Sequence, residues 1–475
     1  MGEGGSSGGT GGGGGEAGST DVPPTVPMTQ PAISRGASYM GFSEKFNRYY
    51  TDPSWVPAKT IYVSPNGAGD GTSAATPASP TAGLAQATPG TKVEFLKGTY
   101  DGCFQLDDTQ SGTYDAPIVL YAERNGASLG VQINCCNTGR ATCFNFEAAS
   151  YVAVDGFELI GGVYGVRAVG SAYAASMHSK GVAVLHNVGH DQNRDPFFTG
   201  EADWFVIEGN TAHDAGAGDG HGIYLSNGSD WLIARGNETY STHSADFQIN
   251  ADPLSCCDNQ IYNVPDCDDL AGNSEGGKGA SDFALVENNF FHHSNAQGAN
   301  FTSVRHSVMR NNIFALSTTH GVSFWQQTGN PKLGSSDNLV FHNLFTTRTT
   351  GGEAVSFIVD SDRNQVKNNI FLSSVAHGDL MDVDGTTNAN VYEQNVYISG
   401  VVNGRTPGGN ELVLASFDTA WFIAFPGALA NDPNGYKPTA SAPFLNREAL
   451  LPEVTLDRAG HPRSAPTDPG PFELP

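Results

Sequence analysis

Short stretches that alternate apolar and polar residues recur between residues 222 and 384. They include "GIYLS", "DFQIN", "NFTSV", "GVSFW", "AVSFI" and "LMDVD". Alternation with a period of two is typical of a strand that buries one face. We therefore expect the apolar members to point into a core and the polar members to point outward.

An apolar-x-Asn phrase recurs between these strands, at steps of 23, 27, 52, 23, 31, 26 and 26 residues. The step of 52 equals two steps of 26, with one phrase missing or displaced by an insertion. A period in the twenties indicates a solenoid, and strands rich in Val, Ile and Phe favour an all-β parallel β-helix over leucine-rich repeats. An Asn at the same corner of each coil can hydrogen-bond to the Asn of the next coil. The Asn residues are Asn187, Asn210, Asn237, Asn289, Asn312, Asn343, Asn369 and Asn395.

Both ends of the repeat carry further motifs, among them "TIYVSPNGAGDG", "SGTYDAPIVLYAE", "YVAVDGFELIGG" and "NGYKPTASAPFLN". These stretches resemble the opening and closing coils of pectate-lyase-like proteins, which are right-handed parallel β-helices. The resemblance covers residues 59–475 and implies a short capping helix at about Pro80–Ala87. Because that superfamily contains lyases, hydrolases, epimerases and inactive proteins, the resemblance implies a fold and leaves the chemistry open.

The chain divides into four expected segments. Residues 1–58 form a Gly/Ser/Pro-rich linker or tail, and residues 59–150 form the N-terminal cap and first coils. Residues 151–415 form the β-helix, with an insertion at 251–281, and residues 416–475 close it. The tail resembles the spacer behind the lipidated cysteine of bacterial lipoproteins, although an ordinary disordered tail has the same composition. We expect a protein that is secreted or held at the bacterial surface by a lipid anchor.

The net charge and the lack of long apolar runs limit which binding partners are expected. The formal charge of −25 disfavours nucleic acid and anionic membranes, and a polyanionic substrate would need cations gathered at the site. No run of eighteen apolar residues predicts a membrane span. A solenoid with capped ends is expected to be a monomer.

The cysteines lack metal-binding spacing and favour the disulfides of an exported protein. The sequence does not determine which cysteines pair. The cysteines are Cys103, Cys135, Cys136, Cys143, Cys256, Cys257 and Cys267.

The outward positions of the alternating strands form a candidate binding surface for a sugar polymer. Amide groups can hydrogen-bond sugar hydroxyls, and an aromatic ring can stack on a pyranose; an ordinary solvated sheet face is the alternative. The expected substrate-binding residues are Tyr224, Gln248, Asn250, Asn300 and Trp325. Asp246, Thr302, Ser323 and Ser356 are expected on the same face.

The insertion is rich in carboxylates, which suit a hard cation such as Ca²⁺. The expected metal ligands are Asp246, Asp268, Asp269 and Glu275. Lys278 follows, and Arg305 lies one coil later. The arrangement loosely resembles family 9 polysaccharide lyases, which implies a calcium site beside a lysine base. Lys278 would then be the catalytic base, and Arg305 would help lower its pKa. An acidic surface loop tied by disulfides is the alternative.

A second cluster lies in "AHDAGAGDGHGIYLS", where His213, Asp214, Asp219 and His221 precede His243 in the next coil. His221 is a candidate general acid or base. "DGHG" also resembles the G-H-G motif of polygalacturonases, but the partner aspartate motifs of that family are absent. Histidines and aspartates that only stabilise coil corners are the alternative.

The favoured prediction is an exported lyase that cleaves an acidic, uronate-containing polysaccharide by calcium-assisted β-elimination. A glycoside hydrolase or epimerase that uses the His/Asp cluster is the second prediction. A non-catalytic carbohydrate-binding surface protein is the third.

Overall fold

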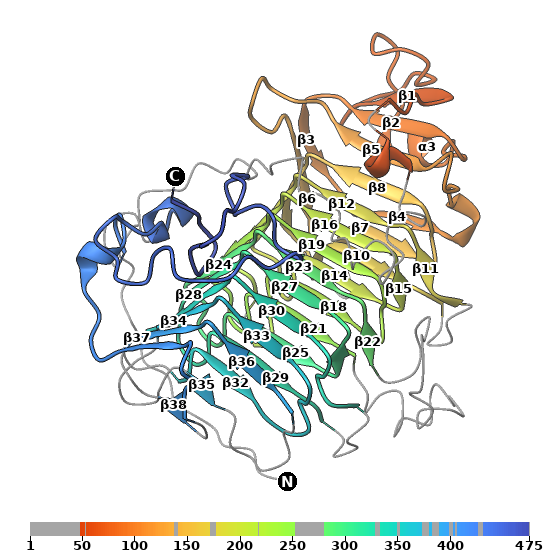
Figure 1. The fold of residues 1–475 in the computed structure, drawn as a ribbon. Coiled ribbons are helices and arrows are strands. Elements are labelled where there is room, and N and C mark those ends of the chain that lie inside the picture. The colour runs from red at the N-terminus through yellow and green to blue at the C-terminus, as the bar shows by residue number, and fades with distance from the viewer. Residues whose placement is uncertain are drawn as a thin grey trace.

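The computed structural model describes residues 48–52, 54–136, 141–171, 177–216, 218–251, 280–327, 333–348, 352–372, 380–381, 389–398, 402–403, 406–425 and 431–474. Within these residues the chain winds into a parallel β-helix, as the repeat predicts (Figure 1). Each coil passes in turn through three long sheets, named here sheets 1, 2 and 3. Every pairing within the three sheets joins one coil to the next in the parallel sense (for example, β14 with β18 and β18 with β21).

Among the described residues, the three sheets contain 12, 12 and 11 strands. Sheet 1 consists of β1 (Lys59–Val63), β2 (Thr91–Phe95), β5 (Ile118–Ala122), β8 (Val152–Asp155), β12 (Ala183–Leu185), β16 (Phe205–Glu208), β19 (Leu232–Arg235), β23 (Leu285–Glu287), β27 (Val308–Arg310), β30 (Leu339–Phe341), β33 (Gln365–Lys367) and β36 (Val391–Glu393). Sheet 2 consists of β3 (Gly98–Asp101), β6 (Val131–Cys135), β9 (Glu158–Gly161), β13 (Val188–His190), β17 (Thr211–His213), β20 (Glu238–Tyr240), β24 (Phe290–His292), β28 (Ile313–Ser317), β31 (Leu344–Thr347), β34 (Ile370–Leu372), β37 (Val396–Ile398) and β39 (Leu412–Leu414). Sheet 3 consists of β4 (Phe104–Asp107), β7 (Thr142–Glu147), β10 (Tyr164–Val169), β14 (Phe197–Gly200), β18 (Ile223–Ser226), β21 (Phe247–Asn250), β25 (Ala299–Thr302), β29 (Val322–Trp325), β32 (Val355–Phe357), β35 (Leu380–Met381) and β38 (Val402–Asn403).

Short elements complete the coils. Two small parallel pairs follow sheet 3: β11 (Ser179–Lys180) with β15 (Ala202–Asp203), and β22 (Ser281–Asp282) with β26 (Val304–Arg305). In the part of the chain that the structure describes, the short helices are α2 (Arg48–Thr51), α3 (Pro80–Leu84) and the 3-10 turns η2 (Asp108–Gln110), η5 (Thr419–Trp421) and η6 (Pro433–Tyr436). The capping helix begins where the sequence predicts, at Pro80 behind the N-cap Ser79, and ends before the predicted Ala87.

The asparagine ladder explains the recurring Asn phrase. From Asn187 to Asn395, each side-chain Nδ2 donates to the Oδ1 of the next ladder asparagine at 2.9–3.1 Å. The residue before each ladder asparagine has a positive φ, as at Asn288 (58°), Asn311 (56°) and Asn368 (57°). Asn and Gly tolerate this left-handed conformation best, which accounts for the Asn-Asn and Gly-Asn pairs.

The ladder also settles the step of 52 residues. Asn237 bonds directly to Asn289, and β21 pairs directly with β25, so this step is a single coil. The extra length lies in residues 252–279, between Ala251 and Ala280. No phrase is missing; one coil is lengthened by the insertion.

Aromatic side chains fill the interior in register with the coils. Phe291, Phe314, Phe345 and Phe371 follow one another with ring centroids 5.2–5.4 Å apart. Such spacing matches the distance between parallel strands, so one aromatic per coil produces a continuous stack.

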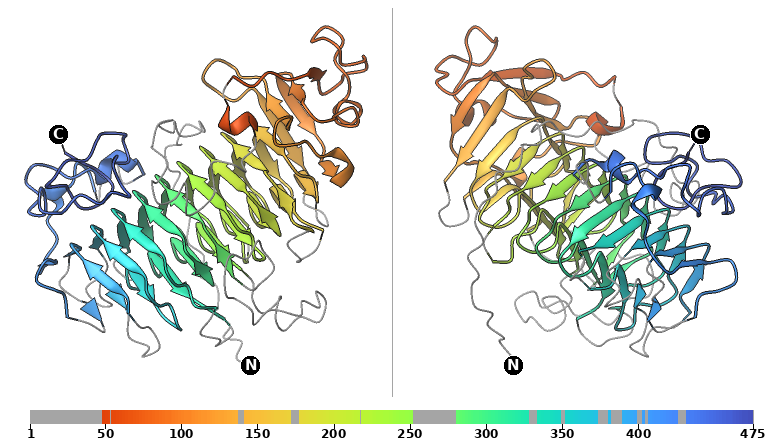
Figure 2. Two further views of the ribbon diagram at one scale, coloured as in Figure 1. Left: turned by 45° about the vertical axis from the view of Figure 1, so that its right-hand side comes forward. Right: turned by 90° about the vertical axis from the view of Figure 1, so that its left-hand side faces the viewer.

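The two ends of the described chain pack against the outside of the solenoid. Tyr49 donates a hydrogen bond to Asp155 at 2.6 Å, near the first coils. The C-terminal segment lies along the corner that carries the ladder, beside β23, β24 and β27 (Figure 1), and Figure 2 shows this blue segment on the outside of the stacked strands. There, the Arg458 guanidinium donates to the carbonyl of Asn289 at 2.8 Å, and Arg463 donates to Asn311 Oδ1 at 3.0 Å.

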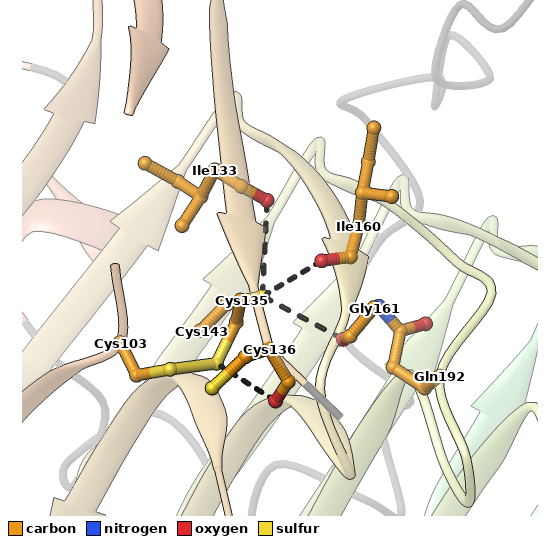
Figure 3. Close-up of a disulfide and its surroundings, with 8 residues drawn as sticks. All are labelled: Cys103, Ile133, Cys135, Cys136, Cys143, Ile160, Gly161 and Gln192. Carbon is orange, nitrogen blue, oxygen red and sulfur yellow. Dashed lines mark hydrogen bonds between the residues drawn. A yellow bond between two sulfur atoms is a disulfide. The ribbon is translucent and has the colours of Figure 1, made fainter. Parts of the chain in front are cut away.

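One disulfide joins two early coils. Cys103 bonds to Cys135 across 32 positions, and Cys143 is a buried thiol nearby (Figure 3). Cys256, Cys257 and Cys267 lie outside the described residues. A search of the described residues finds no helix long and apolar enough to cross a membrane.

Candidate functional site

The outward face of sheet 3 has the predicted alternation. Tyr224, Gln248 and Asn300 occupy one register position on successive strands. Asn250 and Trp325 occupy the position two residues further along the strands. The structure therefore brings the five predicted substrate-binding residues together, while their role in binding remains a prediction.

Hydrogen bonds order the amides on this face. Asn300 Nδ2 donates to Gln248 Oε1 at 2.9 Å, and Trp325 Nε1 donates to Asn300 Oδ1 at 2.6 Å. The rings of Tyr224 and Trp325 are partly exposed, whereas the amides are 5–8% exposed. Among the described residues, Gln248 Nε2 has no hydrogen-bond partner, so it can donate to a ligand.

His221 lies just before β18, at the edge of this face. Its backbone N–H donates to Asp195 Oδ1 at 2.8 Å, and its Nδ1 lies 3.2 Å from the same oxygen. The imidazole packs against the Tyr224 ring, with centroids 4.7 Å apart. Within the described part of the chain, Nε2 has no hydrogen-bond partner. Since a carboxylate on Nδ1 favours the tautomer with a proton there, Nε2 is left as a base.

Asp195 was not predicted from the sequence. Its side chain is fully buried, and it precedes β14 as His221 precedes β18, 26 residues later. Aligning the coils on their strands would have placed the two residues side by side. A search for short motifs could not have found Asp195, because the Asp195-Pro196 pair matches no known motif.

An aromatic row leads away from His221 along the coils. The Tyr224 ring meets Phe198 edge-on at 5.4 Å, and Phe198 meets Tyr164 at 5.0 Å. Arg194 donates to the Tyr164 hydroxyl at 3.3 Å and lies 3.9 Å from Asp195 Oδ2. The contacts therefore close into a ring, which we name the site ring: Tyr164, Arg194, Asp195, Phe198, His221 and Tyr224.

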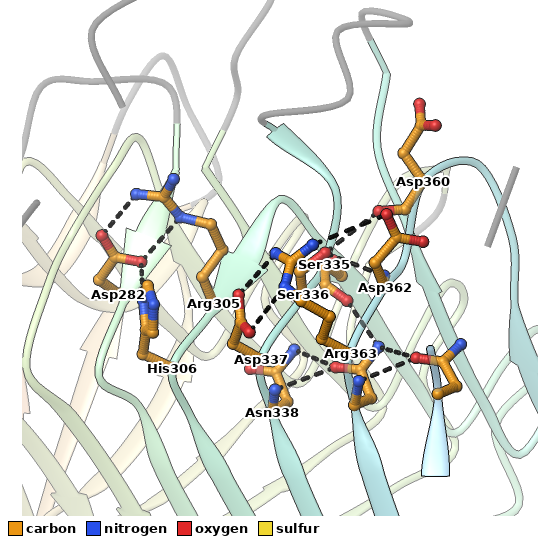
Figure 4. A network of polar contacts seen from close by, with 12 residues as sticks. Asp282, Arg305, His306, Ser335, Ser336, Asp337, Asn338, Asp360, Asp362 and Arg363 are labelled. Carbon is orange, nitrogen blue, oxygen red and sulfur yellow. Dashed lines mark hydrogen bonds and ion pairs between the residues drawn. The ribbon is translucent and has the colours of Figure 1, made fainter. Parts of the chain in front are cut away.

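Arg305 lies at the opposite end of the sheet 3 strands, in β26. Two of its nitrogens contact Asp282 at 2.7 and 2.9 Å, and His306 Nδ1 lies 3.3 Å from the same carboxylate (Figure 4). Burial opposes the charged form of Asp282, but the His306 hydrogen bond and the Arg305 charge outweigh it and lower the pKa of Asp282. The positive charge of Arg305 is thus balanced locally, and the structure does not bring Arg305 and His221 together.

The predicted orientation of Asp246 is wrong. Its carboxyl is fully buried and accepts a hydrogen bond from the Thr242 hydroxyl at 2.7 Å. Burial raises the pKa of Asp246 well above its ordinary value. The alternation ends at Phe247, where β21 begins, and the preceding turn directs Asp246 inward. The role of Asp246 as a calcium ligand stays a prediction from the sequence.

The other predicted calcium residues lie outside the described residues: Asp268, Asp269, Glu275 and Lys278. Where the structure does describe the chain, no three His, Cys, Asp or Glu side chains gather so that they could hold a metal ion. The segment that contains the four residues leaves the coil at Ala251, directly after Asn250 of β21.

The remaining histidine cluster is divided between two sheets. His213 belongs to sheet 2, where its ring stacks between His190 (4.8 Å) and Tyr240 (5.0 Å). Its Nδ1 lies 2.8 Å from Asp214. His213 therefore lies in a ring stack of sheet 2, whereas His221 faces sheet 3.

These features define a right-handed parallel β-helix whose polar and aromatic face carries a His–Asp pair. Among solved structures it is similar to pectate lyase Pel9A, with a TM-score of 0.62 and 13% identity over 89% of this chain and 98% of that chain. An alginate lyase from Paenibacillus sp. str. FPU-7 gives a TM-score of 0.45 and 15% identity over 70% of this chain and 99% of that one. No family model matches the sequence, and a search of curated proteins finds no match. The predicted pectate-lyase-like fold is confirmed.

Proposed function

We propose that this protein is an exported enzyme that cleaves an acidic polysaccharide by β-elimination at a uronate residue. One observation carries the proposal: His221 is held by Asp195 through Nδ1, presents Nε2 without a partner among the described residues, and packs on Tyr224 at 4.7 Å. This group stands at the edge of a face whose amides and aromatic rings suit a sugar chain.

The chemistry follows from these atoms. Nε2 of neutral His221 removes the proton on the uronate carbon next to the carboxylate. The electron pair of that C–H bond forms a double bond to the neighbouring ring carbon, whose bond to the glycosidic oxygen breaks. The Tyr224 hydroxyl supplies a proton to the departing oxygen. Asp195 stabilises the imidazolium that forms.

A two-carboxylate hydrolase is disfavoured. Such enzymes flank the scissile bond with a pair of Asp or Glu side chains. The outward positions of β14, β18, β21, β25 and β29 carry Phe, Gly, Tyr, Ser, Gln, Asn, Thr and Trp, and no carboxylate. Asp195 is buried and engaged with His221.

An epimerase is the second candidate. It shares the first step and differs only in the fate of the carbanion, which takes a proton back on the opposite face. The contact between His221 and Tyr224 favours it as well, because two proton-carrying groups lie at one site. Elimination yields an unsaturated uronate, whereas epimerisation in deuterated water labels the carbon without cleavage.

The fold agrees with this class of substrate, since pectate lyase Pel9A shares it. Calcium and Lys278 remain predictions from the sequence, and no step above uses them. Residues outside the described part of the chain supply three of the four proposed calcium ligands.

The test is ultraviolet absorbance of unsaturated uronate on pectate, alginate, hyaluronan, chondroitin and heparan, with Ca²⁺ and with a chelator. We expect absorbance to rise on one polymer. Neutral xylan and galactan are matched controls without uronate. A flat trace on all acidic polymers, with no deuterium incorporation, contradicts the proposal. Loss of activity with the chelator would support the calcium prediction.

A further inference from the structure

We propose that Arg194 binds the carboxylate of the reacting uronate and makes the site selective for charged polymers. This inference rests on the proposed function and names the residue that recognises its substrate class. Arg194 was not among the residues that the sequence singled out.

Arg194 and His221 lie on either side of the Asp195 carboxylate. Asp195 connects them, with Oδ2 3.9 Å from Arg194 Nε and Oδ1 3.2 Å from His221 Nδ1. On the other side, Tyr164, Phe198 and Tyr224 complete the site ring. A pyranose lying on the partly exposed Phe198 and Tyr224 rings would have the guanidinium at one edge and the imidazole at another.

The charge of Arg194 is available to a ligand. Its side chain is 45% exposed, and the only carboxylate near it in the described chain is Asp195, at 3.9 Å. Two other arginines near sheet 3 are paired with carboxylates more closely. Arg167 lies 2.5 Å from Glu147, and Arg305 lies 2.7 Å from Asp282.

A local cation is needed for two physical reasons. The protein carries a formal charge of −25, so a polyanion is repelled at long range unless a positive group faces it. A guanidinium also matches a carboxylate with two parallel hydrogen bonds. Drawing charge from the carboxylate acidifies the adjacent C–H bond, which His221 must deprotonate.

The variants are Arg194→Gln, Arg194→Lys and Arg447→Gln. Arg447 is a matched control, because its side chain is 40% exposed and lies 3.8 Å from a carboxylate of Glu448. Initial rates on the active polyuronate give KM and kcat. Affinity electrophoresis in gels containing polyuronate or neutral galactan measures binding without turnover.

We expect Arg194→Gln to raise KM on polyuronate about 10-fold or more, with a smaller fall in kcat and weaker retardation in the polyuronate gel. Arg194→Lys should recover part of the affinity, and Arg447→Gln should behave as wild type. Added salt should weaken wild-type retardation more than that of Arg194→Gln.

Three outcomes contradict the inference in distinguishable ways. If wild type cleaves and binds polyuronate but Arg194→Gln is unchanged, Arg194 is not the recognition residue and the proposed function stands. If wild type neither binds nor turns over any polyuronate, both the inference and the proposed function are wrong. Equal weakening by Arg194→Gln and Arg447→Gln also overturns the inference, since it would reflect net charge alone.

Discussion

Removal of one rung of the asparagine ladder should destabilise the whole solenoid. Asn289 is fully buried, and its side chain makes four hydrogen bonds of 2.9 Å. Oδ1 accepts from the backbone and side chain of Asn237, and Nδ2 donates to Ala234 O and Asn312 Oδ1. Asn289→Ala removes all four and leaves buried partners unsatisfied.

The magnitude follows from this count. At about 1 kcal/mol for each bond, the substitution costs about 4 kcal/mol in the free energy of unfolding. An unfolding entropy of about 2 cal/mol/K per residue gives about 1 kcal/mol/K for 475 residues, so the melting temperature should fall by about 4 °C.

Differential scanning calorimetry of wild type, Asn289→Ala and Asn66→Ala tests the reasoning. Asn66 lies exposed in a turn outside the ladder, so its variant should melt within about 1 °C of wild type. A fall no larger for Asn289→Ala than for Asn66→Ala would refute the view that the ladder stabilises the coils.

Three further substitutions test separate parts of the structure. Asp195→Asn should lower kcat by about 10²–10⁴-fold, because an amide no longer favours the His221 tautomer with a free Nε2; unchanged initial rates would remove Asp195 from the site. Burial raises the pKa of Asp246, so the folded state holds its proton more tightly than the unfolded state and stability falls as pH rises above about 4. The melting temperature of Asp246→Asn should therefore rise relative to that of wild type as pH rises above about 4, and a difference independent of pH would contradict the raised pKa of the buried carboxyl. Cys103→Ser opens a loop of 32 positions and should lower the free energy of unfolding, measured by urea denaturation, by about 4 kcal/mol. An unchanged midpoint would show that the disulfide does not constrain the unfolded chain.

The repeat was predictable because its causes are local. A period of two places Ile223, Leu225 and Phe247 inward, and the structure confirms each of them as buried. The Asn phrase was equally predictable, because the left-handed corner favours Asn or Gly and the side-chain ladder requires Asn. These requirements recur in every coil, so they leave a periodic trace in the sequence.

The candidate site was only partly predictable, because it depends on contacts between coils. His221 was found from its residue type, but its partner Asp195 lies 26 residues earlier and requires the register of β14 and β18. The pairing of Arg305 with Asp282 likewise depends on β22 and β26 lying side by side. The predicted orientation of Asp246 was wrong because the alternating pattern was extended to Asp246, one residue before β21 begins.

The identity of the catalytic base is tested by comparing two candidate residues on the polymer that wild type cleaves. His221→Ala and Lys278→Ala are assayed for unsaturated uronate under the same conditions, with circular dichroism to confirm that both fold. If His221 is the base, His221→Ala should lower kcat at least about 100-fold, whereas Lys278→Ala should lower it less than about tenfold. A large loss in Lys278→Ala, with His221→Ala close to wild type, would contradict this assignment and return the catalytic base to the insertion.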